Sequence, residues 1–436
     1  MLSPGRRWSD DPVTFGRRTL LALGLTGLLV ACTEETTAPG RCPAFCPGGQ
    51  LSVVDTVLNI ISRDSSYVGY VVPESAGVMM AVNFGGVDAR PIFTLGGVST
   101  RIAVNSADTT TDTAQSVDSA LLTMTIARRD TLATNLRINL YRMPLSIGPT
   151  TTLADLSGPF TDSLLRTINV DSLLALPGGV DSASGDSAVY TDTTHIGVRV
   201  VMKLNAVQAN YMAADSGRSA FGIRITADSL ASVAFNTVTG GSGPIFSWWG
   251  TYDSSGTSVS RRFGTAVNLF NSYVSNVSAP TLDSNLIVGG VPSARSILRF
   301  TLPRNIRDSS QIVRATLTMI PVAAPVGVPS DSLLLVVYRL GTDVGAKSPI
   351  AVATIADSSL LVVAAVPIGH ADTIATDITD IVRFWQADTL VPQSVMIRQA
   401  PEGGNLISVR LYSTRSPAFR PALHVTYVPR FAFGNP

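Results

Sequence analysis

Two adjacent tryptophans and a nearby tyrosine are the side chains whose chemistry best suits ligand binding. Trp248 and Trp249 stand next to each other, and Tyr252 follows shortly after them. Sugar rings stack on exposed aromatic side chains, because the C–H face of the ring is apolar while its hydroxyl rim is polar. Adjacent residues of a strand point to opposite faces, so we expect one tryptophan in the core and the other in solvent. Trp248, Trp249 and Tyr252 are therefore the predicted carbohydrate-binding residues.

Residues that could carry out catalysis are present, but their spacing is not typical of an active site. The three histidines, His195, His370 and His424, do not stand at metal-ligand spacing from one another. Asp186 and Ser187 follow a glycine in a sequence that resembles the setting of a serine nucleophile. No pattern of a base and its orienting partner accompanies that serine. We therefore predict no catalytic residue and no enzyme activity.

Two aspartate-rich stretches, at residues 108–118 and 181–192, raise the question of calcium binding. Calcium takes about six to eight oxygen ligands from a loop of defined spacing, which neither stretch follows. We interpret both as solvated acidic loops, with calcium binding as the alternative. No glycine-rich loop has the setting of a nucleotide-binding site. The sequence therefore predicts neither a metal site nor a cofactor.

The N-terminal residues have the pattern of an export signal. Four arginines within residues 6–18 precede an apolar run at residues 19–31. This run is shorter than the roughly 20 residues of an ordinary transmembrane helix, but it has the length of a signal-peptide core. It ends in Leu-Val-Ala-Cys at residues 29–32, which resembles the lipobox of bacterial lipoproteins. The resemblance implies cleavage before Cys32, lipidation of Cys32 and a location in the outer membrane or at the cell surface; the alternative is an uncleaved anchor.

The two other cysteines, Cys42 and Cys46, form an even pair once Cys32 carries a lipid. In an oxidising compartment such a pair is expected to close a small disulfide loop. A metal site is the alternative, but two thiolates without a nearby histidine fall short of a zinc ligand set. Residues 33–50 are otherwise rich in Thr, Pro and Gly and are predicted to form a flexible tether.

One stretch of the chain occurs twice. Residues 204–226 align without a gap with residues 378–400, at an offset of 174. In the second copy the apolar residues have the spacing of one helix face, and an alternating strand pattern follows. Further identities keep the same order at offsets between 195 and 207: Gly85-Gly86 with Gly289-Gly290, Phe93 with Phe300, Thr123 with Thr318, and Tyr141 with Tyr338. The chain is therefore predicted to contain two copies of one unit.

Each copy is predicted to be a β-sandwich, because many short alternating segments are separated by Gly-, Pro- and Ser-rich turns. The predicted fold is all-β, with two tandem jelly-roll-like sandwiches that each contain a short helix. We place the lipoprotein signal at residues 1–32, the tether at residues 33–50, the first sandwich at residues 51–255 and the second at residues 256–436.

The second copy resembles the DNRLRE-type domain, a family of bacterial surface β-sandwiches related to carbohydrate-binding modules. The matching segments are residues 285–289 (NLIVG), 296–303 (SILRFTLP), 315–319 (ATLTM), 377–385 (DITDIVRFW), 412–413 and 420–427 (RPALHVTY). The resemblance implies a jelly-roll sandwich with a binding or structural role outside the cell.

The charge composition excludes a nucleic-acid partner. Charged residues make up 14% of the chain, against roughly 25% in average proteins. Basic and acidic residues nearly cancel, 32 against 31, so no strongly basic face is expected.

The predicted function is that of a non-catalytic exported lipoprotein that binds polysaccharide or another extracellular polymer. The alternative is a structural or adhesive cell-surface protein without a small ligand, whose partner is a protein. A sugar-binding module predicts a groove with exposed aromatic side chains, whereas a spacer predicts that every tryptophan is buried.

Overall fold

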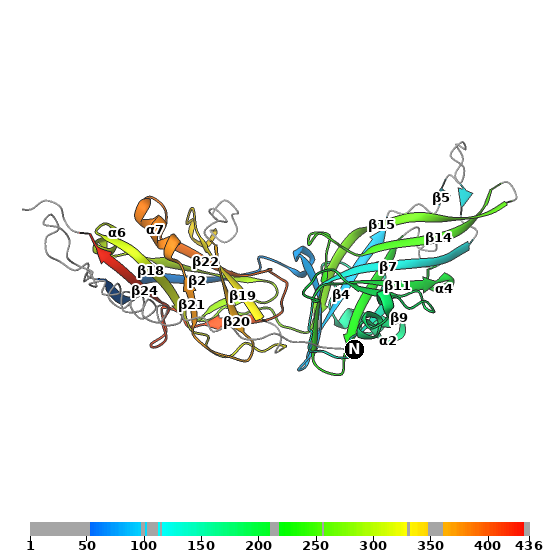
Figure 1. Ribbon diagram of the computed structural model, residues 1–436, viewed down its shortest axis with the longest axis horizontal. Coiled ribbons are helices and arrows are strands. Elements are labelled where there is room, and N and C mark those ends of the chain that lie inside the picture. Colours follow the sequence, from blue (N-terminus) through cyan, green and yellow to red (C-terminus); the bar gives the residue numbers. More distant parts are fainter. Residues whose placement is uncertain are drawn as a thin grey trace, which may run out of the picture.

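Antiparallel β-strands build most of this protein, and they gather into two bodies that lie end to end (Figure 1). The computed structural model describes residues 53–96, 101–102, 112–113, 116–209, 218–254, 257–328, 332–347 and 361–430. The predicted signal and tether, with Cys32, Cys42 and Cys46, lie outside the described residues. The prediction of an all-β sandwich fold is confirmed.

One body, which we call the terminal sandwich, contains both ends of the described chain in two facing sheets. Its smaller sheet has the order β1 (Val54–Leu58), β24 (Ala422–Pro429), β18 (Ser310–Met319), β21 (Ile374–Asp377). Its larger sheet has the order β20 (Leu361–Pro367), β19 (Ser332–Arg339), β22 (Ser394–Gln399), β17 (Ala294–Phe300), β16 (Leu286–Gly289), β23 (Ser408–Leu411), with β2 (Ile61–Val68) also paired to β17. Leu298, Leu317 and Val425 belong to the apolar core between the sheets. The chain crosses repeatedly from one sheet to the other, as in a jelly roll.

The other body, the inserted sandwich, is a curled sheet. Its main strands are β3 (Val78–Phe84), β4 (Val87–Gly96), β7 (Ser116–Arg129), β8 (Arg137–Arg142), β9 (Leu164–Asn169), β10 (Ser187–Tyr190), β11 (Val198–Asn205), β12 (Ser219–Thr226), β13 (Ala231–Asn236), β14 (Ile245–Ser254) and β15 (Thr257–Ser275). Strand pairing closes a ring in the order β7, β13, β3, β4, β15, β14 and back to β7. The ring surrounds an apolar core that includes Phe93, Phe235 and Trp248. Short strands β5 (Arg101–Ile102) and β6 (Asp112–Thr113) pair with each other.

Helices are short and lie at the margins of the sheets. The longest, α7 (Thr379–Ala387), buries Ile381, Val382 and Trp385 against the core of the terminal sandwich, as its spacing predicts. The Trp385 ring packs on Phe300, with ring centroids 5.2 Å apart. The other α-helices among the described residues are α2 (Pro159–Asp162), α3 (Val170–Leu174), α4 (Ala206–Ala209) and α6 (Arg304–Arg307).

The segments that match in sequence occupy matching places in the two bodies. Strand β11, helix α4 and strand β12 follow one another as β21, α7 and β22 do, at the sequence offset of 174. Thr123 pairs with Val201, and the equivalent Thr318 pairs with Ala375. Tyr141 and Tyr338 pair in the same way with Gly222 and Met396. At these positions the internal repeat is a repeat of strand register as well as of sequence. Phe93, however, pairs with Phe221 and so corresponds to Leu298, which pairs with Val395, and not to Phe300.

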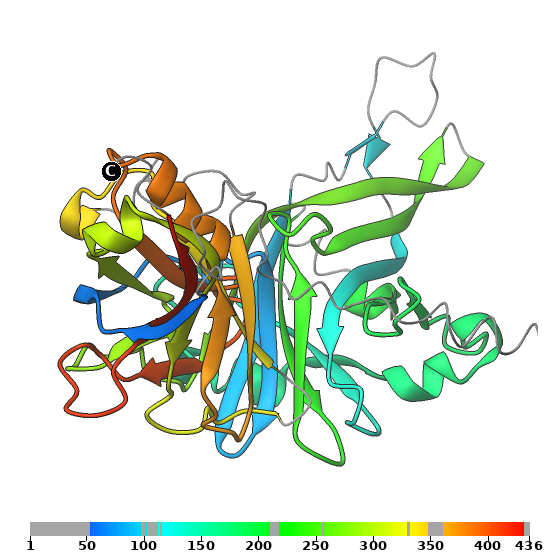
Figure 2. The ribbon, with the colours of Figure 1, turned by 60° about the vertical axis from the view of Figure 1, so that its left-hand side comes forward.

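The two bodies do not coincide with the predicted units at residues 51–255 and 256–436. β1 and β2 pair with β24 and β17 of the terminal sandwich, and Figure 2 shows these blue strands among its yellow, orange and red ones. β15 (Thr257–Ser275), which lies within the predicted second unit, pairs with β14 and β4 of the inserted sandwich. The physical reason is that alternation shows that a segment is a strand, whereas its partner is set by hydrogen bonding between distant segments.

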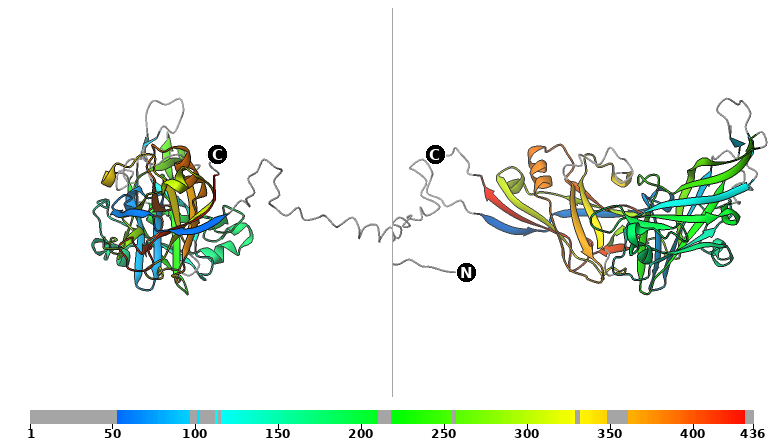
Figure 3. Two further views of the ribbon diagram at one scale, coloured as in Figure 1. Left: turned by 90° about the vertical axis from the view of Figure 1, so that its left-hand side faces the viewer. Right: turned by 45° about the vertical axis from the view of Figure 1, so that its right-hand side comes forward.

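Both ends of the described chain lie at one end of the molecule. β1 and β24 are antiparallel, and Val54 pairs with Tyr427. In Figure 3 these strands, blue and red, reach the end of the terminal sandwich that faces away from the inserted sandwich. Residues 78–275 are thus carried at the opposite end.

Replacement of Trp385 by alanine is expected to destabilise the terminal sandwich by about 4 kcal/mol, because it leaves a large cavity beneath α7. The free energy of unfolding in urea measures this effect. Leu390→Ala is the matched control, since Leu390 is 95% exposed and its loss should change stability by less than about 0.5 kcal/mol. Equal effects of the two substitutions would contradict the assignment of Trp385 to the core.

Candidate functional site

The predicted aromatic platform is divided between the core and the surface. Trp248 and Trp249 lie on β14, as adjacent residues that point to opposite faces. Trp248 is fully buried in the core of the inserted sandwich, so its ring has no face to offer a sugar and the prediction for this residue is corrected. Trp249 is half-buried. Tyr252 lies on the same strand, but its side chain is outside the described residues.

The other residues noted for their chemistry have structural surroundings. The Asp186 carboxylate is buried, pairs with Arg166 and accepts the backbone N–H of Lys203 at 2.8 Å. The His195 ring stacks on Tyr190, with centroids 4.3 Å apart, while His370 and His424 are exposed. Within the described part of the chain, no three His, Cys, Asp or Glu side chains are grouped as a metal site would require.

A cluster of charged side chains lies where the two bodies meet. The loop at residues 400–407 connects β22 to β23, and its Glu402 side chain is only 6% exposed. Arg295 of β17 donates two hydrogen bonds to this carboxylate, both at 2.7 Å. Arg398 of β22 donates a third at 2.9 Å, and the Ser293 hydroxyl adds a fourth at 3.1 Å. Glu402 is thus held by groups from two strands of the larger sheet.

Aromatic rings support both arginines. The Arg398 guanidinium lies 4.6 Å from the centroid of the Tyr338 ring, and it donates a hydrogen bond to the Tyr338 hydroxyl at 2.7 Å. The Arg295 guanidinium lies 4.6 Å from the Tyr70 ring centroid. Such stacking is favourable for a planar cation and fixes its orientation. The cluster is therefore a preorganised clamp for one carboxylate, and Glu402 already fills it.

The electrostatics of the clamp keep Glu402 ionised. Burial alone raises the pKa of its carboxyl group, but hydrogen bonds from Arg295 and Arg398, with their positive charges, outweigh burial and lower the pKa below its ordinary value. A carboxyl group with a lowered pKa cannot serve as a general acid near neutral pH. The arrangement therefore supports a positioning role for Glu402.

The same loop contacts the inserted sandwich through its backbone. The Tyr273 hydroxyl of β15 donates to the Gly403 carbonyl at 2.7 Å, and the Arg128 guanidinium of β7 donates to the Gly404 carbonyl at 3.0 Å. Leu406 packs in the core of the inserted sandwich. Gly403 has a φ of +68°, and a side chain there would come within 2.9 Å of Ala76. The loop is therefore a link that side chains of both bodies hold in place.

Two grooves flank this link. One, of about 390 Å³, is lined by the hydroxyl groups of Thr151, Thr152, Ser272 and Ser275, by Glu74, and by prolines and other apolar residues. The other, of about 330 Å³, is largely apolar, with Phe84, Val326 and Leu406 in its lining and Arg410 at its polar part. The first groove can hydrogen-bond a polar ligand such as a polyol, but no nucleophile with a base lines it.

Neither the clamp nor the grooves were among the sequence-predicted sites. Arg295, Ile297 and Arg299 alternate along β17, which shows one face carrying arginines beside an apolar residue. This alternation could have predicted that the face of β17 turned away from the core carries arginines. Nothing in the sequence connected Arg295 to Glu402, which lies 107 residues away, and Arg299 pairs with Asp343 instead.

Comparison of the chain with known protein families and with curated protein sequences gives no match. The similarity to the DNRLRE-type domain therefore stays a prediction. Among the described residues, no helix has both the length and the apolar character needed to cross a membrane.

Replacement of Glu402 by glutamine is expected to lower stability by roughly 2 kcal/mol at pH 7, because two partly buried guanidinium groups lose a buried counter-charge. Since the folded-state pKa of Glu402 is lowered, its contribution is present above the ordinary value of 4.5 and is lost as the pH falls through the folded value. Urea unfolding of both proteins between pH 7 and pH 3 should therefore show a difference that shrinks in acid. A difference independent of pH would contradict this role, and Glu74→Gln, at an exposed position, serves as control.

Proposed function

We propose that this protein is a non-catalytic protein of the cell envelope, anchored by a lipid on Cys32, with a structural or adhesive role. In this proposal the terminal sandwich carries the inserted sandwich away from the anchored end. The observation that carries it is the place of β1, which joins the N-terminal residues to the end of the terminal sandwich opposite the inserted one. A lipid-anchored tether that enters there would point residues 78–275 outward.

The link between the bodies supports a structural role. The Glu402 clamp fixes the loop at residues 400–407 to the terminal sandwich, while Tyr273 and Arg128 fix the same loop to the inserted sandwich. With this link, the inserted sandwich keeps a fixed orientation relative to the end of the terminal sandwich that we propose is anchored. Trp248 and Trp385 are both fully buried, which favours a spacer over a sugar-binding platform at those residues.

Polysaccharide binding is the second candidate, and the hydroxyl-lined groove favours it. This groove of about 390 Å³ offers several hydroxyl groups and the exposed carboxylate of Glu74 beside prolines. Sites of this size between two bodies are typical for ligands. The half-buried ring of Trp249 lies on β14 and does not line the groove, so the two sites can be tested separately.

Replacement of Cys32 by serine should move the protein from the membrane fraction to the soluble fraction of an expressing bacterium, because the residue can no longer carry a thioether-linked lipid. Immunoblots of the separated fractions, with metabolic labelling by a radioactive fatty acid, give the measurement. Cys42→Ser and Cys46→Ser are the matched controls and should leave the protein labelled and membrane-bound. Continued labelling of Cys32→Ser would overturn the anchor.

The chain from residue 51 onward is expected to show no saturable binding to a panel of soluble and insoluble polysaccharides, if its role is structural or adhesive. Isothermal titration and pull-down assays measure this. Saturable binding that Glu74→Ala weakens about tenfold, while Trp249→Ala does not, would instead establish the groove as a sugar site and favour the second candidate. Weakening by Trp249→Ala alone would place the sugar site on β14.

A further inference from the structure

The two bodies exchange their leading strands. In the terminal sandwich, β1 pairs with β24 and β2 pairs with β17. In the inserted sandwich, one long strand, β15, makes both equivalent contacts, first with β14 and then with β4. In the sequence, however, β1 and β2 precede β3 and β4, whereas β15 precedes β16 and β17. The strands β1 and β2, which precede the inserted sandwich in the chain, thus belong to the terminal sandwich. The strand β15, which precedes most of the terminal sandwich, belongs to the inserted sandwich.

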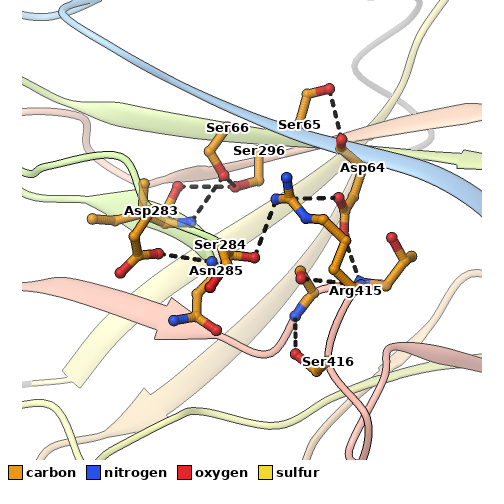
Figure 4. A network of polar contacts seen from close by, with 12 residues as sticks. Asp64, Ser65, Ser66, Asp283, Ser284, Asn285, Ser296, Arg415 and Ser416 are labelled. Atoms are coloured by element: carbon orange, nitrogen blue, oxygen red, sulfur yellow. Dashed lines mark hydrogen bonds and ion pairs between the residues drawn. The ribbon is translucent and has the colours of Figure 1, made fainter.

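The place occupied by β2 is built to receive it. Figure 4 shows the polar contacts around Asp64 and Ser66. The Ser66 hydroxyl lies 2.9 Å from the Ser296 hydroxyl and accepts the backbone N–H of Ile287 at 3.0 Å. The Asp64 side chain is 3% exposed and accepts the backbone N–H of Thr414 at 2.6 Å, with the Arg415 guanidinium 3.8 Å away. These contacts come from strands and loops on several sides of β2.

The two strands are not interchangeable. Ser66 faces Ser296, and the position that pairs equivalently in the inserted sandwich is Tyr273, beside Pro91. A small hydroxyl side chain suits the first place, where Ser296 and Ile287 crowd it. The second place requires a long side chain, whose hydroxyl reaches the Gly403 carbonyl. Each strand thus carries a side chain whose contacts the other strand does not make, and this difference favours its own place.

Contacts between the strand segment and its sandwich end before the chain enters the inserted sandwich. The backbone N–H groups of Gly69 and Tyr70 both donate to the Ser293 carbonyl, and Ser293 donates back to Val71. Glu74 and Ser75 then follow as exposed residues of a short 3-10 turn at Pro73–Ser75. The covalent connection at this turn is therefore separate from the contacts that hold β1 and β2.

We propose that the terminal sandwich contains a strand-binding site whose ligand is an extended peptide, here residues 54–71 of the same chain. The ligand is recognised by backbone pairing with β24 and β17 and by a carboxylate and a small hydroxyl group at the positions of Asp64 and Ser66. Pairing along two sheets with alternate side chains in defined places is the general mode of strand addition. The peptide bond between the ligand and the inserted sandwich is not needed to hold it.

The test uses the chain from residue 51 onward with a protease site inserted between Glu74 and Ser75. After cleavage, the N-terminal piece is expected to elute with the rest of the protein in gel filtration under native conditions. Elution of the two pieces apart would overturn the proposal. Circular dichroism and thermal unfolding of the uncut protein, measured first, verify that the insertion leaves the fold intact.

Variants and peptides then test recognition. Asp64→Ala should speed dissociation of the cut piece by about tenfold, while Asp64→Asn, which keeps an oxygen acceptor, should do so less. After removal of the cut piece in denaturant and refolding, a labelled peptide of residues 53–71 should bind the remaining chain, and a peptide of residues 257–275 should not compete. Equal competition by the two peptides, or no effect of Asp64→Ala, would refute the specificity of the site.

Discussion

Backbone pairing between segments at opposite ends of the chain is the constraint on which the rest of this structure depends. β17 and β24 would present open edges of hydrogen-bonding groups if β1 and β2 did not cover them. The contacts involved join residues as far apart in sequence as Asp55 and Thr426, whose side chains meet at 2.9 Å. The terminal sandwich is complete only when β1 has paired with the last strand of the chain, and such a non-local pairing slows folding.

The link between the bodies shows how one short loop can serve two cores. The side chain of Glu402 is directed to the arginines of the terminal sandwich, whereas the carbonyls of the next two residues accept hydrogen bonds from the inserted sandwich. Glycine at 403 permits both, because its backbone adopts a positive φ in a crowded space. Polar contacts of this density at a junction define orientation more than they add stability.

The spacing of apolar residues in the sequence predicted the features of the fold that depend on neighbouring residues. The helix face at Ile381 and Trp385 followed from residue spacing, because a helix that buries one face repeats its apolar residues every three or four positions. The sequence did not predict which body β1 and β15 join, because apolar and polar residues alternate along a strand in the same way in either body. Because Trp248 and Trp249 are adjacent, we expected one of them to be buried, but the sequence did not show which one. The Glu402 clamp was not predicted, because Arg295 stands on a strand that only the fold brings to the loop, and the short spacing of Arg398 and Glu402 does not by itself indicate that they pair.

The antiparallel pairing of β1 with β24 also determines how the molecule would carry a mechanical load. A pull on the residues before Val53, resisted by the inserted sandwich, acts along the axes of β1 and β2 rather than across them. The hydrogen bonds from Val54 to Leu58 and from Ile61 to Val68 then bear the force together, in shear. Bonds loaded in shear must break as a group, whereas bonds at the end of a hairpin open one after another. The strand order that makes this chain hard to divide into units also gives it high resistance to extension from its N-terminal end.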